Sequence, residues 1–324
     1  MTERAIIEKA AAAIGGADSL ALACHVGPDG DALGSMLGLG IAASNAGKKV
    51  VASFASPFVM PSGLDFLPHE LLVSPGDFPD SPEVMVVLDA GSAERLGELG
   101  SNALDADTVV VIDHHVTNDG FGDIALVDPS AAATGELVYE ILKTLDWDLT
   151  PEIATCLHTA LVTDTGRFSY ANTTPKTLQI ASELVAAGAV PSLISRHVYE
   201  EAPFGYLKAA GVAMERARLD VDLSAVSTIV TDDDLEAQDI DWGDTENLID
   251  LLRLALEADT AVLVKSHADG RVKVSMRSRG DTDVGGLAAS MGGGGHRLAA
   301  GFTTTDGDAE QVRARVLAAI EDYR

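Results

Sequence analysis

The segment Asp113-His114-His115 places three side chains that can bind divalent metal ions directly after an apolar stretch of the chain. That stretch, Val109–Ile112, predicts a buried parallel strand, so the three side chains are expected at its carboxyl end. In open α/β sheets, sites form outside the carboxyl ends of the strands. The position of the segment therefore predicts a functional site.

Carboxylates and imidazoles elsewhere in the chain could join this site, because they also follow apolar runs or a predicted helix. With one histidine of the segment they make a set of metal-ligand candidates: His25, Asp29, Asp31, Asp89, His114 and Asp164. Taken alone, Asp31 would be a helix N-cap, Asp89 a loop residue and Asp164 the start of an Asx turn. Their combination favours a two-metal hydrolytic site, in which Asp89 bridges the ions through its two oxygens.

The mixture of donor atoms bears on the identity of the metal and on the two adjacent histidines. Oxygen and imidazole ligands together favour Mn²⁺, with Mg²⁺, Co²⁺ or Fe²⁺ as alternatives. Neighbours on an extended segment point to opposite sides, so His114 and His115 are not expected to bind the same ion. One of the two imidazoles should bind metal, and the other should contact a phosphate of the substrate or the leaving group. Asp113 should orient one of these imidazoles.

The elements that must hold these residues alternate between strand and helix patterns along the first half of the chain. This alternation is typical of a parallel sheet covered by helices. One of the helices is predicted to be capped by Thr134 and to end at Leu145. The strands are expected at residues 19–25, 50–53, 84–88, 109–112 and 124–127.

A second α/β pattern begins near Ser224, after a helical stretch, and it offers groups that bind anions. Ser275 and Arg277 end a predicted strand with a hydroxyl and a cation. The run 292–295 is four glycines, whose backbone N–H groups could form an anion nest, and His296 follows it. The alternative is a flexible glycine loop. A longer helix is expected at Asn247–Glu257.

These patterns predict an α/β protein of two domains with the active site in the cleft between them. The first domain, residues 1–190, holds the parallel sheet and the metal-ligand candidates. A helical linker is expected at 191–217, followed by a smaller α/β domain at 218–324 that binds substrate.

The composition limits the classes of partner. Lys and Arg total 22 against 50 Asp and Glu, a net charge of −28. A long nucleic acid binds through many basic contacts to phosphate, so we expect a small substrate instead. The chain shows neither a long uninterrupted apolar window nor a signal-peptide pattern, and its cysteines, Cys24 and Cys156, lie in apolar segments. These features favour a cytoplasmic protein with no membrane partner.

Six segments resemble the motifs of the DHH phosphoesterase family, and within it the nanoRNase and pAp-phosphatase group. The last two of them resemble the DHH-associated C-terminal domain. The segments are HVGPDGDALGS (25–35), VVLDAGS (86–92), VIDHH (111–115), LVTDTGRFSY (161–170), VSMRS (274–278) and GGGGHRLAAGF (292–302).

The resemblance implies a role for each candidate residue. One Mn²⁺ would be held by His25, Asp29 and Asp89. The other would be held by Asp31, Asp89, His114 and Asp164. His115 would assist at the phosphate. The nucleotide or its terminal phosphate would be bound by Ser275, Arg277, Gly293, Gly294, Gly295 and His296, with Arg167 as a further phosphate contact.

The expected activity is metal-dependent hydrolysis of small nucleotide phosphates, in which a metal-bound hydroxide attacks phosphorus. Candidate substrates are RNA of a few nucleotides, 3′-phosphoadenosine 5′-phosphate (pAp), and linear or cyclic dinucleotides such as pApA, pGpG and cyclic di-AMP. The resemblance also implies a homodimer. Two other functions remain open: a RecJ-like single-strand exonuclease, which the acidic charge argues against, and a nucleotide sensor without catalytic activity.

Overall fold

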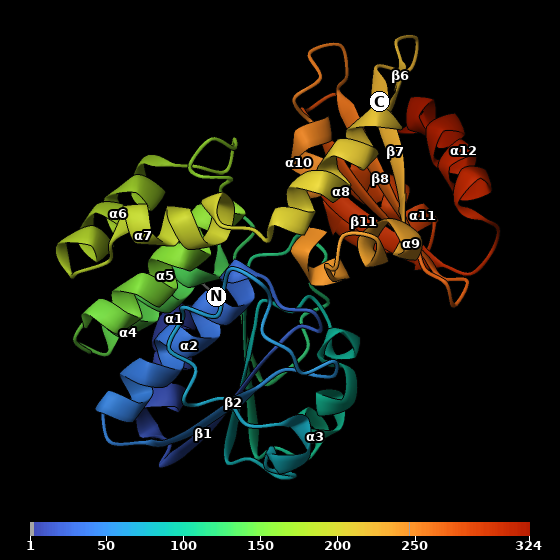
Figure 1. Cartoon of the computed structure of the whole chain (residues 1–324). Coiled ribbons are helices and arrows are strands. Elements are labelled where there is room, and N and C mark those ends of the chain that lie inside the picture. Colours follow the sequence, from blue (N-terminus) through green and yellow to red (C-terminus); the bar gives the residue numbers. More distant parts are fainter. Residues whose placement is uncertain (1–2, 246) are drawn as a thin grey trace. The chain divides into compact units, whose positions relative to one another are not determined.

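The computed structural model describes residues 3–245 and 247–324, and the chain forms two compact units, Met1–Glu200 and Glu201–Arg324 (Figure 1). Within the described residues no single helix is long and apolar enough to cross a membrane. One pair of helical segments, Pro175–Ala186 and Pro191–Glu200, bent by 107° where they join, would meet the criteria of length and composition together.

The first unit is built on a five-stranded sheet in which every neighbouring pair of strands is parallel. Its strand order, β2-β1-β3-β4-β5, reverses direction between β1 and β3. Such a reversal is where open parallel sheets form their binding sites. The strands are β1 (Ser19–Cys24), β2 (Lys49–Ser53), β3 (Val84–Leu88), β4 (Thr108–Asp113) and β5 (Ile124–Val127).

Both faces of this sheet are covered, which explains why its central strands, β1, β3 and β4, are almost continuously apolar. One face packs against a large core shared with helices α1 (Glu3–Gly16), α2 (Gly30–Asn45), α4 (Thr134–Thr144) and α5 (Pro151–Asp164). The other face packs against a smaller core that includes the region around α3 (Gly100–Leu104) (Figure 1). Helices α2 and α5 approach closely at Gly34, where an added Cβ would lie 2.4 Å from the carbonyl oxygen of Cys156.

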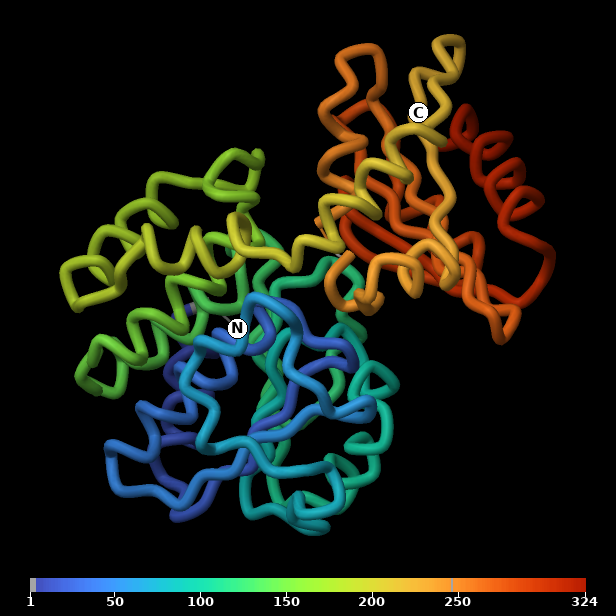
Figure 2. The backbone as a smooth tube through the Cα atoms, in the orientation of Figure 1, coloured from blue at the N-terminus to red at the C-terminus, as the bar shows by residue number. Residues whose placement is uncertain are grey.

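Helical segments complete the first unit and open the second, and Figure 2 traces the chain through them. They are α6 (Pro175–Ala186), α7 (Pro191–Ser195), a π-helical turn at Arg196–Glu200, and α8 (Phe204–Glu215), which lies in the second unit. Proline occupies the first turn of α6 and α7, as its fixed φ favours.

The second unit contains a mixed six-stranded sheet in the order β10-β11-β9-β8-β7-β6. Only β7 and β8 pair in parallel, and the other neighbours are antiparallel. The strands are β6 (Arg218–Asp220), β7 (Ala225–Thr231), β8 (Thr260–Ser266), β9 (Val272–Ser278), β10 (Gly294–His296) and β11 (Ala299–Thr304). The two units together confirm the predicted α/β class, with a parallel sheet first and a mixed sheet second.

Helices cover this second sheet from both sides, over separate cores. One core is shared with α11 (Val284–Ser290) and α12 (Ala309–Ala319), and the other with α8, α9 (Asp232–Glu236) and α10 (Leu248–Leu252). The helix predicted at Asn247–Glu257 is wrong in its extent, because α10 ends at Leu252. The guanidinium of Arg279 donates to the carbonyl oxygens of Arg253 (2.6 Å) and Leu256 (3.4 Å), so these groups are satisfied outside a helix.

Candidate metal centre

The six metal-ligand candidates all lie in the first unit and come together near the carboxyl edge of its sheet. His25 and Asp29 belong to the segment after β1, Asp89 directly follows β3, and His114 directly follows β4. The remaining two are helical: Asp31 lies in the first turn of α2, and Asp164 is the last residue of α5. The sheet thus gathers side chains that are far apart in the sequence.

A first group of ligand atoms is formed by His25, Asp29 and Asp89, whose donor atoms all lie within 4.8 Å of one another. Nε2 of His25 is 3.5 Å from Oδ2 of Asp89 and 3.9 Å from Oδ1 of Asp29. The Asp29 side chain is 59% exposed, so this side of the cluster opens toward solvent. Asp29, rather than Asp31, is the N-cap of α2, and its Oδ1 accepts from the backbone N–H groups of Asp31 and Ala32.

A second group surrounds His114 and is more deeply buried. Nε2 of His114 lies 3.4 Å from Oδ2 of Asp164, 3.6 Å from Oδ2 of Asp31 and 3.7 Å from Oδ1 of Asp89. These separations exceed a normal hydrogen bond. They are close to the spacing of about 3–4 Å between atoms that share one divalent ion through bonds of about 2.0–2.2 Å. Asp89 thus faces both groups through different oxygens.

The tautomers of the two histidines fit a metal site. Nδ1 of His25 lies 3.0 Å from the carbonyl oxygen of Val26, and Nδ1 of His114 lies 3.2 Å from that of Ala131. A carbonyl oxygen only accepts, so each Nδ1 carries a proton, and each Nε2 is the ring nitrogen that faces the carboxylates. The buried carboxylates need positive charge beside them, which a proton on Nε2 or a metal ion can supply, and a backbone-oriented imidazole is the usual form of a metal-bound histidine.

Without metal, the same electrostatics appear as displaced pKa values. Burial lowers the pKa of His25, but Asp89 and Asp29 raise it by more, to about 9. Burial likewise lowers the pKa of His114, and its carboxylate neighbours, first among them Asp164, raise it to about 9. Burial raises the pKa of Asp164 to about 7. Carboxylates outnumber imidazoles in this buried cluster, so it binds positive charge, as protons or as metal ions.

Asp89 behaves differently from the other carboxylates and has an unusual backbone. Burial alone would raise its pKa, but His25, His115 and His114 hold the pKa well below its usual value. The carboxylate is therefore ionised at the centre of the cluster. Its φ of +56° is in the left-handed region, which a non-glycine residue rarely adopts. Residues held in this region cluster at functional sites, where surrounding structure maintains them.

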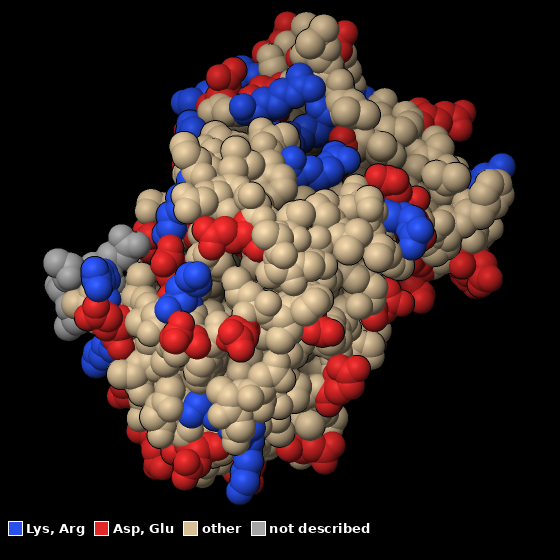
Figure 3. All heavy atoms as spheres, turned by 90° about the vertical axis from the view of Figure 1, so that its left-hand side faces the viewer, with Lys and Arg blue, Asp and Glu red and all other residues tan. Residues whose placement is uncertain are grey.

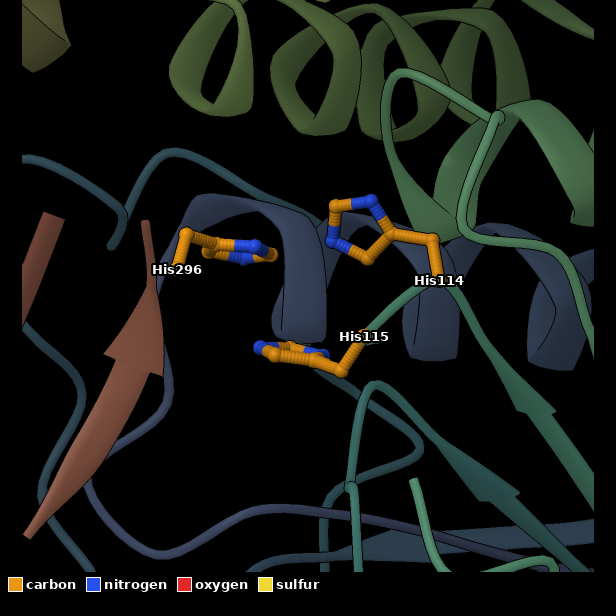
Figure 4. A group of neighbouring side chains, drawn as sticks. All are labelled: His114, His115 and His296. Carbon is orange, nitrogen blue, oxygen red and sulfur yellow. The ribbon is translucent and has the colours of Figure 1, made fainter. Parts of the chain in front are cut away.

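His115 adjoins the ligand groups and pairs with Asp113, and its Nδ1 also lies 3.6 Å from Oδ1 of Asp89. Its ring lies at 73° to that of His114, with centroids 5.1 Å apart (Figure 4). Nδ1 of His115 is 2.7 Å from Oδ1 of Asp113. The other Asp113 oxygen accepts from Nδ2 of Asn118 at 2.6 Å, a contact that the sequence pattern does not suggest. Burial lowers the pKa of His115, while Asp113 and Asp89 raise it above its usual value.

Arg167 lies just beyond Asp164 in a tight turn of the first unit. Gly166, Arg167 and Phe168 all have positive φ, of 53°, 62° and 61°. The guanidinium of Arg167 stacks over the ring of Tyr199 at 4.8 Å, which restrains a long side chain. This contact was not expected from the sequence, because Tyr199 lies in the π-helical turn far along the chain.

The anion-binding candidates of the second unit share one face of its sheet. Arg277 and His296 are both register partners of Ala299, which lies between them on β11, and Figure 4 labels His296. Ser275 pairs with Gly301 two positions along, so it points to the same side. The alternate residues of β9 and β11 face the core with α11 and α12. Ser275, Arg277 and His296 therefore lie on the opposite face.

The glycine run joins this face as an edge strand. Gly294 and Gly295 pair with Gly301 and Ala300 of β11. Gly293 packs so closely that an added Cβ would lie 2.2 Å from the carbonyl oxygen of Gly301. Only glycine allows this approach, which brings the backbone of residues 293–295 next to the row of polar side chains.

Thr134 contacts the metal-ligand candidates, which the sequence pattern did not predict. The predicted N-cap role is wrong: the cap of α4 is Ala133, and the structure shows no side-chain capping bond there. The Thr134 hydroxyl instead donates to Oδ1 of Asp89 at 2.9 Å. Ser35, one turn into α2, similarly donates to Oδ1 of Asp31 at 2.9 Å. The Thr134 hydroxyl bonds to a carboxylate 45 residues away in the sequence, which no local pattern indicates.

Two family models match this chain, and together they cover most of it. The model described as the DHH family, N-terminal domain, matches residues 19–161, and the DHHA1 domain matches residues 224–323. The chain belongs to the DHH family of phosphoesterases.

Relatives of similar length agree with this assignment. The chain is 34% identical over 302 residues to the bifunctional oligoribonuclease and PAP phosphatase NrnA of Thermus thermophilus, covering 93% of this chain and 89% of the relative. It is 30% identical to the protein of the same name from Bacillus subtilis, with 94% of each covered. Among solved structures, an exopolyphosphatase-related protein from Bacteroides fragilis matches with a TM-score of 0.89 and 25% identity, over 98% of this chain and 97% of that one.

Proposed function

We propose that this protein is a Mn²⁺-dependent phosphohydrolase of small nucleotides, acting on short oligoribonucleotides and on pAp. The observation that carries the proposal is the convergence of His25, Asp29, Asp31, Asp89, His114 and Asp164 at one edge of the first sheet. The relatives with this whole-chain similarity are named for those two activities.

The donor geometry supports a division of the ligands between two ions. His25, Asp29 and Asp89 would hold one, and Asp31, Asp89, His114 and Asp164 the other. Bound there, divalent ions would activate water and neutralise charge on the phosphoryl group. The mixed oxygen and imidazole donors favour Mn²⁺, with Mg²⁺ or Co²⁺ as alternatives.

The remaining residues of the first unit would act on the phosphate itself. Nδ1 of His115 is held by Asp113, and this oriented imidazole would act on a phosphate oxygen or the leaving oxygen. Arg167, restrained by Tyr199, would supply a cation for a phosphate. Both would stabilise charge that increases during the displacement.

The second unit would recognise the part of the substrate away from the reacting phosphate. Ser275, Arg277 and His296 offer a hydroxyl, a guanidinium and an imidazole from one sheet face, beside the backbone of Gly293–Gly295. These groups suit a nucleotide or its terminal phosphate. A few fixed cations are enough for a small substrate. On the face in Figure 3, acidic side chains are spread widely and basic ones form separate groups.

We further propose that the enzyme acts as a cytoplasmic homodimer.

A substrate panel tests the proposed function. The purified chain with Mn²⁺ is supplied with pAp, pApA, pGpG, cyclic di-AMP and a long single-stranded RNA, and released phosphate or mononucleotide is followed. Turnover should be fastest on pAp or a linear dinucleotide and slow on the long strand. Preference for the long strand would support a RecJ-like exonuclease, and binding without turnover would support a sensor.

A further inference from the structure

The segment from the end of β5 through the first turn of α4 contacts most of the deeply buried ligand candidates. The carbonyl oxygen of Ala131 accepts from Nδ1 of His114 at 3.2 Å. The carbonyl oxygen of Ala132 and that of Asp164 both accept from Nδ2 of Asn172, at 3.0 and 3.1 Å. These contacts hold the start of α4 against the metal-ligand cluster.

Within this segment, Thr134 contacts two candidate ligands at once. Its backbone N–H donates to Oδ2 of Asp31 at 2.7 Å, and its hydroxyl donates to Oδ1 of Asp89 at 2.9 Å. The N–H of Gly135 completes the arrangement by donating to Oδ1 of Asp31 at 3.0 Å. The start of α4 therefore ties the first turn of α2 to the end of β3. Thr134 is fully buried, so water does not compete for these bonds.

The hydroxyl bond selects one oxygen of Asp89. Oδ1 accepts from Thr134 and is the oxygen 3.7 Å from Nε2 of His114, whereas Oδ2 is 3.5 Å from Nε2 of His25. The terminal torsion of an aspartate side chain is broad and roughly two-fold, so the carboxylate plane needs an external restraint. A carboxylate oxygen has two lone pairs, so Oδ1 can accept from Thr134 and still bind an ion.

We propose that Thr134 is a positioning residue for the reaction. Its hydroxyl sets the plane of the Asp89 carboxylate so that one oxygen faces each metal position. This inference rests on the proposed function, because it takes Asp89 as the ligand shared by both ions. It adds a residue outside the ligand set that controls how well the two ions are held.

The test uses Thr134→Val, which keeps the branched shape and removes the hydroxyl, and Thr134→Ser, which restores it. Thr134→Ala serves as a second hydroxyl-free variant if the valine protein does not fold. Thr159→Val is the matched control, because Thr159 is also fully buried but its hydroxyl donates to the carbonyl oxygen of Thr155 within α5. Mn²⁺ binding is measured by the loss of the free-ion electron paramagnetic resonance signal, alongside kcat and KM for pAp and the melting temperature without metal.

Thr134→Val should weaken Mn²⁺ binding and lower kcat by roughly 10- to 100-fold, the range seen when a group that orients a ligand is lost. KM for pAp should change little. Thr134→Ser and Thr159→Val should bind Mn²⁺ as the unaltered protein does. A folded Thr134→Val or Thr134→Ala protein that binds two Mn²⁺ with unchanged affinity overturns the inference and leaves the proposed function standing. If the unaltered protein binds no Mn²⁺, the proposed function fails, and the inference with it.

Discussion

Nδ1 of His115 lies 2.7 Å from Oδ1 of Asp113 and 3.6 Å from Oδ1 of Asp89, so this pair adjoins the metal-ligand candidates. Asp113 is fully buried, and its second oxygen accepts from Asn118. Both carboxylate oxygens are thus used, one to hold the imidazole and the other to anchor the carboxylate. On the proposed function, this pair would act on the phosphate, while the six ligand candidates would hold metal.

Asp113→Asn should therefore lower kcat while two Mn²⁺ still bind. An amide in place of the carboxylate turns one oxygen into a donor, so either the contact with His115 or the contact with Asn118 is lost. We expect kcat to fall by roughly 10- to 100-fold, as for other groups that orient a functional imidazole. Steady-state kinetics on pAp and a Mn²⁺ titration of the same protein check this. An unchanged kcat would remove Asp113 and His115 from the mechanism.

Asp89→Asn should be more damaging, because Asp89 faces both ligand groups. Removing its charge should reduce kcat by more than about 100-fold, on the scale expected for losing metal-based charge stabilisation. It should also reduce the number of bound Mn²⁺ ions. Asp123→Asn is a suitable control, since the Asp123 carboxylate accepts from the N–H of Val109 and has a structural role. Near-normal turnover with two ions bound to Asp89→Asn would refute the bridging role.

Arg277→Ala should raise KM for substrates that carry a phosphate or base away from the reacting bond. A charge-assisted hydrogen bond to phosphate contributes about 1.5–3 kcal/mol, so kcat/KM for pAp or a dinucleotide should fall roughly 10- to 150-fold. A minimal phosphodiester without that distal group should be hydrolysed almost as before. Equal losses on both substrates would mean that Arg277 acts at the reacting phosphate or in folding.

The acid sensitivity of the second unit should depend on Asp259. Burial opposes ionisation of this residue, but hydrogen bonds from Asp281, Thr282 and Ser278 outweigh it and hold the pKa below its usual value. A lowered folded-state pKa stabilises the protein above the unfolded value of about 3.9, and this contribution is lost as the pH falls through the folded value.

Asp259→Asn should therefore lower the melting temperature at pH 7. Near pH 3, the melting temperatures of the variant and of the unaltered protein should lie closer together. Thermal unfolding at both values measures this. A melting temperature that is unchanged at neutral pH would show that the hydrogen bonds to Asp259 contribute nothing to stability.

Sequence patterns predicted the first sheet well because its central strands, β1, β3 and β4, are buried on both faces and are therefore almost continuously apolar. The polar residue that ends each run, such as Asp89 after β3 or His114 after β4, then marks the carboxyl edge. Parallel strands bring those ends together whatever their separation in sequence, so the candidate ligands could be predicted to converge.

The parts that could not be predicted depend on contacts between distant residues. Thr134 looks like a helix cap in its local sequence, but Asp89, 45 residues away, takes its hydroxyl. The helix expected to reach Glu257 ends at Leu252, and Arg279, just after β9, donates to carbonyl groups of the residues that follow. Neither partner is visible to local propensity, which weighs only neighbours along the chain.

Turnover before and after metal removal tests the central claim most directly. The protein is stripped with a chelator, its metal content is confirmed to be negligible, and hydrolysis of pAp is measured in excess chelator and after Mn²⁺ or Ca²⁺ is restored. A site built from these carboxylates and imidazoles predicts no turnover without metal, recovery with Mn²⁺, and poorer recovery with Ca²⁺, which prefers all-oxygen sites. Full activity in the metal-free protein would contradict the account.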